Sequence, residues 1–182
     1  MGNIKEILEF NKKFVENKEY ELYNSSKYPQ KKLAILSCMD TRLTELLPAA
    51  LNLKNGETKV IKNAGAVITH PFGSVMRSLI VAIYELNVEE VLVIGHYDCG
   101  MQGLDTDKVI QEMMDRGISK ETIEMISCCG IDYYNWLKGF ESAETSVTET
   151  VDMIKKHPLI PDDVNVYGLM IDPKTGELSQ LR

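Results

Sequence analysis

The stretch EEVLVIGH (residues 89–96) carries the clearest signal for the fold. Its centre is a short, continuous run of valine, leucine and isoleucine, which is typical of a strand buried on both faces of a parallel sheet. His96 ends the run, and Cys99 follows after two more residues. The stretch therefore predicts a central strand with two metal-binding side chains at or just after its carboxyl end.

Strand and helix signals alternate along the rest of the chain. Further strands are predicted at 31–37, 58–65 and 164–181, the last of which folds back on itself through a turn at 172–176. Apolar residues recur at helical spacing over six ranges: 3–17, 41–53, 73–87, 107–117, 120–137 and 143–158. This alternation predicts an α/β fold with a mostly parallel central sheet flanked by helices, preceded by an N-terminal helical arm.

Length and charge narrow the class of protein. The chain has 182 residues, about the length of one domain, and we expect a single domain over residues 1–182. The formal net charge of −7 disfavours nucleic acid and anionic membranes as partners, because both need a basic surface. No apolar run approaches the ~18 residues of a membrane span, and the N-terminus lacks the apolar core of a signal peptide. We therefore expect a cytoplasmic protein.

Three predicted strands end in groups that could form a metal site. The first ends at Cys38, the second at residues 63–65, and the third at His96, with Cys99 just beyond. Because ligands bind beyond the carboxyl ends of parallel strands, the two thiols and the imidazole would meet if these strands are neighbours. Two thiolates and an imidazole suit zinc, and three protein ligands with an open position are typical of catalytic rather than structural sites.

Asp40 and Arg42 lie two and four residues beyond Cys38, on the same strand end. Arginine is always charged and pairs bidentately with carboxylates, so it would keep Asp40 ionised and oriented beside the metal. Such a carboxylate could accept a hydrogen bond from zinc-bound hydroxide, or could itself take the fourth position on the metal.

Taken together, these motifs resemble the β-class carbonic anhydrases. The pattern C-x-D-x-R is present as CMDTR (38–42) and is followed by H-x-x-C as HYDC (96–99), with VIKNAG (60–65) between them. Each motif alone is weak, but the combination is highly specific. The resemblance is to the compact form of the class and covers essentially the whole chain, including HPLIP (157–161) near its end.

For the fold, the resemblance implies a sheet of order 2-1-3-4 to which a short edge strand is added. It also implies a homodimer, or a homotetramer assembled from dimers. The helical arm, residues 1–25, would then contact a partner subunit.

For the site, the resemblance implies one Zn²⁺ per subunit bound by Cys38, His96 and Cys99. Asp40 and Arg42 match the catalytic dyad of the family. The implied reaction is the reversible hydration of CO2 to bicarbonate by attack of zinc-bound hydroxide. The residues expected near the substrate are Gly65, Ala66 and Val67.

Two other functions remain open at this point. Relatives with the same zinc ligands hydrolyse carbon disulfide or carbonyl sulfide, and Ala66 stands where many relatives have a polar residue. A non-catalytic zinc-binding module is the other alternative.

Polar residues around the motifs are given mainly structural roles. His70 follows the second strand and could transfer protons, since histidine exchanges protons near neutral pH, but an exposed loop position is favoured. Tyr97 and Asp98, inside H-x-x-C, are expected to shape the turn. Cys128 and Cys129 are adjacent in a predicted helix, where packing or partial exposure is favoured over a redox role.

Overall fold

The computed structural model describes residues 2–181, and its centre is a sheet of five strands in the order β2-β1-β3-β4-β5. The strands are β1 (Leu33–Cys38), β2 (Thr58–Asn63), β3 (Glu90–His96), β4 (Asn165–Ile171) and β5 (Leu178–Gln180). The first four are parallel, and β5 pairs antiparallel with β4. This confirms the predicted fold class, the strand order and the added edge strand.

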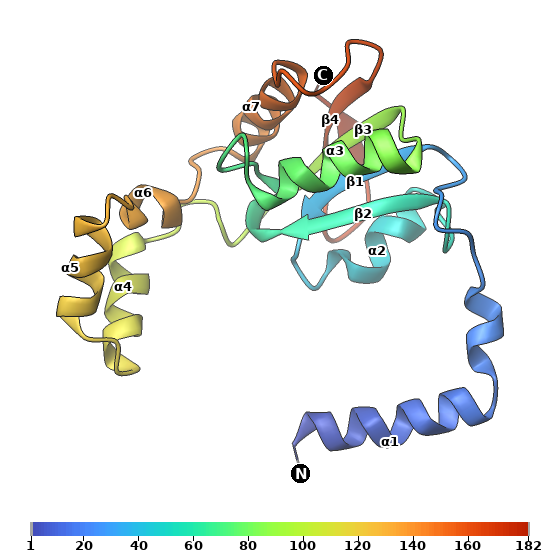
Figure 1. Ribbon diagram of the computed structural model, residues 1–182, viewed down its shortest axis with the longest axis horizontal. Helices are drawn as coiled ribbons and strands as arrows, with labels where there is room; N and C mark the ends of the chain where they lie inside the picture. Colours follow the sequence, from blue (N-terminus) through green and yellow to red (C-terminus); the bar gives the residue numbers. More distant parts are fainter. Residues whose placement is uncertain (1, 182) are drawn as a thin grey trace.

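Helices cover both faces of this sheet (Figure 1). The helices of the chain are α1 (Asn3–Glu16), α2 (Leu43–Ala50), α3 (Ser74–Leu86), α4 (Thr106–Asp115), α5 (Lys120–Cys128), α6 (Tyr133–Leu137) and α7 (Ala143–Lys155), with short 3-10 turns η1 (Glu19–Tyr23) and η2 (Ala64–Ala66). Helices α3 and α7 share one apolar cluster with the sheet, and α2 packs in a second cluster. Strand β1, which lies between β2 and β3, is buried at every position, as expected for a strand covered on both faces.

The predicted helix at 120–137 is wrong in its extent, because the chain forms two helices there, α5 and α6. Gly130 adopts a φ of +82° and its N–H donates to the carbonyl of Ser127, while the N–H of Ile131 reaches back to the carbonyl of Ile126. This pair of hydrogen bonds around a left-handed glycine ends a helix. The side chain of Asp132 then caps the next one by accepting from the N–H of Asn135.

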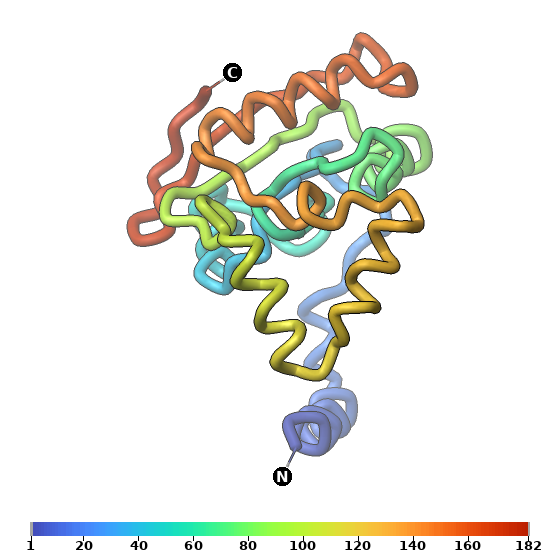
Figure 2. The backbone as a smooth tube through the Cα atoms, turned by 90° about the vertical axis from the view of Figure 1, so that its left-hand side faces the viewer, coloured from blue at the N-terminus to red at the C-terminus, as the bar shows by residue number. Residues whose placement is uncertain are grey.

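Two parts of the chain extend away from the sheet (Figures 1 and 2). The first is α1, which has no buried residue and exposes 60–65% of Ile4, Ile7, Leu8 and Phe10. The second comprises α4, α5 and α6, and we refer to residues 104–139 as the helical excursion. No helix within residues 2–181 is long and apolar enough to cross a membrane.

Candidate metal centre

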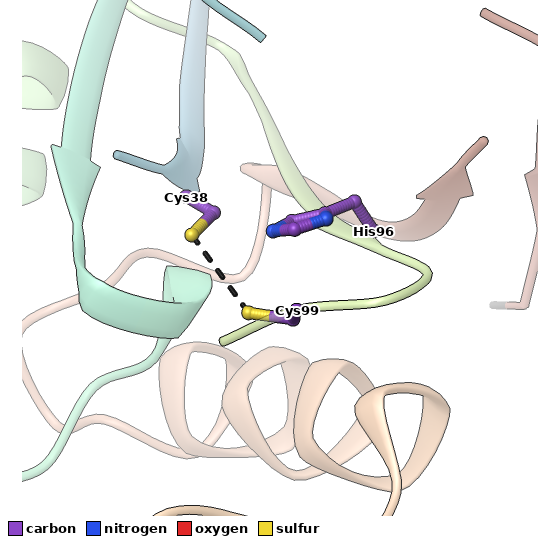
Figure 3. A group of neighbouring side chains, drawn as sticks. All are labelled: Cys38, His96 and Cys99. Atoms are coloured by element: carbon purple, nitrogen blue, oxygen red, sulfur yellow. Dashed lines mark hydrogen bonds between the residues drawn. The ribbon is translucent and has the colours of Figure 1, made fainter. Parts of the chain in front are cut away.

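Cys38, His96 and Cys99 meet at the carboxyl edge of the sheet. Cys38 ends β1 and His96 ends β3, and these two strands pair directly in parallel register. The candidate ligand atoms of the three residues all lie within 4.8 Å of one another, with the two sulfur atoms 3.9 Å apart. Figure 3 shows the sulfur atoms and the imidazole facing a common point. All three side chains are buried.

The hydrogen bonding of His96 fits a metal ligand. Its Nδ1 lies 2.8 Å from the carbonyl oxygen of Tyr97, so Nδ1 carries the proton and donates it there. Its Nε2 is buried and has no hydrogen-bond partner in the described chain. A buried nitrogen without a partner is costly, and binding of a cation by its lone pair would remove that cost. The donor set of two sulfurs and one nitrogen is the one that zinc prefers.

The two thiols differ in their tendency to ionise. Burial raises the pKa of Cys38, but the His96 imidazole and the backbone N–H groups of Gly65 and Asp40 outweigh burial and lower that pKa to about 7. Burial raises the pKa of Cys99 to about 11, with the N–H of Met101 opposing the rise and Cys38 adding to it. Two negative sulfurs at this distance repel each other, so a divalent cation would allow both to ionise.

Asp40 lies beside these side chains and is held by Arg42. Arg42 Nε donates to Asp40 Oδ1 at 3.0 Å and Nη2 donates to Oδ2 at 2.8 Å. The backbone N–H of Arg42 also donates to Oδ1, at 2.9 Å. These hydrogen bonds lower the pKa of Asp40 to about 2, so the carboxylate is charged at neutral pH. Its Oδ2 lies 3.9 Å from Nε2 of His96.

Asp98 is a contact of Arg42 that the sequence analysis did not anticipate. Its Oδ2 accepts from Nη1 of Arg42 at 2.7 Å, and its backbone carbonyl accepts from Nη2 at 2.8 Å. The Arg42 side chain therefore makes four hydrogen bonds, two to Asp40 and two to Asp98, out of the five that a guanidinium can donate. The sequence did contain a signal for this contact, because an acidic residue inside H-x-x-C could pair with the arginine of C-x-D-x-R.

The predicted substrate-side residues lie in and after η2. Gly65 has a φ of +85°, and its N–H donates to Cys38 Sγ at 3.4 Å. Ala66 is completely buried. The backbone N–H of Val67 donates to the side chain of Asn63 at 3.2 Å, and its carbonyl accepts from the same side chain.

Other cysteines and histidines lie outside the group. Cys128 and Cys129 are exposed. His70 is exposed, and its Nδ1 accepts a hydrogen bond from the backbone N–H of Phe72. The ring centroid of Phe72 lies 5.2 Å from that of buried His157. Within residues 2–181, Cys38, His96 and Cys99 form the one cluster with the geometry to hold a metal ion.

Comparisons with known proteins agree with this geometry over nearly the whole chain. A family model described as carbonic anhydrase matches residues 33–178. The Bacillus subtilis protein YtiB, which carries a provisional carbonic anhydrase name, is 58% identical over 178 residues, spanning 98% of this chain and 95% of that protein. A carbon disulfide hydrolase from Acidithiobacillus thiooxidans is 26% identical over 154 residues, spanning 81% of this chain and 76% of that protein.

A solved structure agrees closely as well. The crystal structure of β-carbonic anhydrase isoform I from Trichomonas vaginalis matches with a TM-score of 0.90 at 35% sequence identity, covering 100% of this chain and 98% of that chain. Both the sequence match and the shared fold include β1 and β3, whose ends carry Cys38 and His96. The chain therefore belongs to the β-carbonic anhydrase family.

Proposed function

We propose that this protein is a zinc-dependent carbonic anhydrase, an enzyme that interconverts CO2 and bicarbonate. The observation that carries the proposal is the meeting of Cys38, His96 and Cys99 beside the ionised Asp40. Three protein ligands leave a coordination position for a reacting molecule. Zn²⁺ held there would act as a Lewis acid that lowers the pKa of water and supplies hydroxide near neutral pH.

Asp40 has the properties of an orienting acceptor. Because its pKa is about 2, it is ionised throughout the neutral range and does not compete for the proton of the attacking oxygen. Oδ1 accepts two hydrogen bonds from Arg42, but Oδ2 accepts only one and has a second lone pair available. Asp40 could accept the hydrogen of the attacking hydroxide and so direct the oxygen lone pair toward the carbon of CO2.

Arg42 would act through Asp40. Four of its hydrogen bonds already go to Asp40 and Asp98, so little of the guanidinium remains for a substrate. We assign it the role of fixing the carboxylate in one orientation, because positioning of reacting groups contributes strongly to rate.

We assign the backbone around Gly65, Ala66 and Val67 to the substrate side of the site. Gly65 and Ala66 are buried, and the alanine methyl occupies little volume. A small apolar surface suits CO2, which is uncharged and makes weak hydrogen bonds.

Hydrolysis of CS2 or COS is the second candidate function. The observation that favours it is the similarity to a carbon disulfide hydrolase over 81% of this chain. The same ligands and the same Asp40 could direct hydroxide at the central carbon of these linear molecules.

We also propose that residues 1–182 form one domain whose helical arm, residues 1–25, packs on a second copy of the chain. The support is the unpaired apolar face of α1, which in isolation would leave Ile4, Ile7 and Leu8 in water. Light scattering on the full chain and on an Ile7→Glu, Leu8→Glu variant would test this. A dimer or tetramer should dissociate in the variant, and an unchanged mass would contradict the proposal.

The function is tested by stopped-flow hydration of CO2 with a pH indicator, using zinc-loaded protein between about pH 7 and 9, where zinc lowers the pKa of water. Cys38→Ser serves as the metal-binding control. The same preparation is assayed for sulfide release from CS2 and COS. Faster sulfide release than CO2 hydration would favour the second candidate, and absence of both activities would contradict catalysis.

A further inference from the structure

The helical excursion joins the domain next to the candidate metal centre. We refer to the two segments that meet there, residues 101–103 and residue 140, as the neck. At the neck, the N–H of Phe140 donates to the carbonyl of Met101 at 3.2 Å, and the N–H of Gly103 donates to the carbonyl of Phe140 at 2.9 Å. The N–H of Gln102 donates to the carbonyl of Cys99 at 2.9 Å. The neck is therefore bonded to the same turn that carries a candidate ligand.

The side chains of Phe140 and Met101, both in the neck, lie close to Gly65. A Cβ atom at Gly65 would lie 2.8 Å from Cε1 of Phe140 and 3.2 Å from Cγ of Met101. No side chain would fit in that space without displacing them. The Phe140 ring is half-buried and packs against both apolar clusters of the domain. Phe140 thus closes the space on the side of Gly65 that faces the neck.

The backbone N–H of Gly65 donates to Cys38 Sγ at 3.4 Å. Such a hydrogen bond withdraws electron density from a thiolate, so a metal bound to that sulfur would be a stronger Lewis acid. Glycine has more backbone freedom than any other residue, and at a φ of +85° its conformation depends on what packs around it. The contacts with Phe140 and Met101 supply that packing.

We infer that Phe140 is a positioning residue of the metal centre: its ring, together with Met101, holds the Gly65 amide on Cys38 Sγ. Phe140 packs on Gly65 and on the apolar cluster that contains Cys38, and in this role it acts on the sulfur through the Gly65 amide. The inference rests on metal binding at Cys38, His96 and Cys99, as in the proposed function.

The test replaces the metal with ¹¹³Cd in the full chain, since thiolate ligands bind this soft cation. The measured quantities are the scalar coupling between the Gly65 amide proton and ¹¹³Cd across the hydrogen bond, the ¹¹³Cd chemical shift, and the solvent exchange of that amide. Phe140→Ala should lose the coupling, shift the ¹¹³Cd signal and expose the amide to exchange. Phe140→Leu, which refills part of the space, should restore part of the coupling.

Ile154→Ala is the matched control. Ile154 is fully buried in the same apolar cluster as Gly65's neighbour Ala66, but lies near the far end of α7. This variant should lose stability and keep the coupling. Unchanged coupling and shift in Phe140→Ala would overturn the inference, as would absence of the coupling in the unmodified chain. If Phe140→Ala does not fold, Phe140→Leu decides, with reduced coupling in support and full coupling against.

The two proposals can fail separately. A chain that shows the Gly65 coupling and loses it in Phe140→Ala, yet hydrates no CO2, would contradict the proposed function alone. An active enzyme whose coupling is insensitive to residue 140 would contradict the positioning role alone.

Discussion

The carboxyl edge of the sheet and the helical excursion contain the same kinds of side chain in different surroundings. At the edge, Cys38 and Cys99 are 61 residues apart in sequence but have their sulfur atoms 3.9 Å apart, and both are buried. In the excursion, Cys128 and Cys129 are adjacent in sequence, and both are exposed. Neighbouring residues at a helix end point in different directions, whereas two strand ends can point at one site.

The acidic and basic residues of the two regions differ in the same way. At the edge, Arg42 is fixed by two carboxylates. In the excursion, Arg116 follows α4 at its end, and Asp115 accepts a hydrogen bond from the exposed side chain of Gln111. The difference shows that the topology of the sheet, rather than residue type, brings these charged groups together.

The largest effect is expected for the metal content. Cys38→Ser should reduce zinc from about one per chain to nearly none, because it removes one of three candidate ligands. The double variant Cys128→Ser, Cys129→Ser should keep full zinc. Elemental analysis after dialysis measures both. Zinc retained in the first variant, or lost in the second, would break the contrast between the two cysteine pairs.

A large effect on turnover is expected at the charged pair of the edge. Asp40→Asn or Arg42→Ala should keep zinc and lower kcat for CO2 hydration by roughly 10²-fold, the scale on which a positioned proton acceptor contributes to rate. Asp115→Asn and Arg116→Ala are the matched substitutions in the excursion and should keep kcat unchanged. Full turnover in either edge variant would show that the pair has no part in the reaction.

A smaller effect is expected at Asp98. Asp98→Asn removes the charge that holds Nη1 of Arg42 but leaves the backbone carbonyl that holds Nη2. We expect kcat to fall by about tenfold with zinc content unchanged, because Arg42 is less well positioned. Steady-state kinetics would measure this. A loss equal to that of Arg42→Ala would mean that Asp98 is as important as the arginine itself.

The smallest effect concerns stability in acid. Arg42 lowers the pKa of Asp40 from 3.8 to about 2, so their pairing stabilises the folded protein above about pH 4 and this contribution disappears as the pH falls toward 2. The pair is partly exposed to solvent, so the contribution should be small. Urea unfolding of metal-free wild type and Asp40→Asn would measure it. The difference in free energy of unfolding should shrink on acidification, and a difference that grows would reverse the predicted sign.

Much of the fold could be predicted from the sequence because the buried strands are short apolar runs with polar ends. The run at 89–96 and the one ending near Cys38 identified two strand ends, and the geometry of parallel sheets then predicted that His96 and the two cysteines converge. The break between α5 and α6 was missed because apolar spacing continues past Gly130, while the helix end depends on backbone hydrogen bonds around that glycine.

The contacts that support the site were harder to predict from the sequence, for a different reason. The contact between Gly65 and Phe140 joins residues far apart in the chain, and no local pattern predicts which ring will pack on which glycine. Asp98 was assigned to turn geometry because its pairing with Arg42 depends on how two strand ends are oriented. Strand ends can be predicted from local sequence, but the packing behind them depends on the assembled tertiary structure.

The neck at Met101 and Phe140 also has a consequence for which changes in chain length the domain can tolerate. Because the excursion leaves and re-enters between residues joined by backbone hydrogen bonds, its length and sequence can change without moving β1 or β3. Insertions and deletions within residues 104–139 should therefore be tolerated far better than a one-residue shift between Cys99 and Met101. The domain thus has an attachment point through which a helical segment joins it without supplying a candidate ligand.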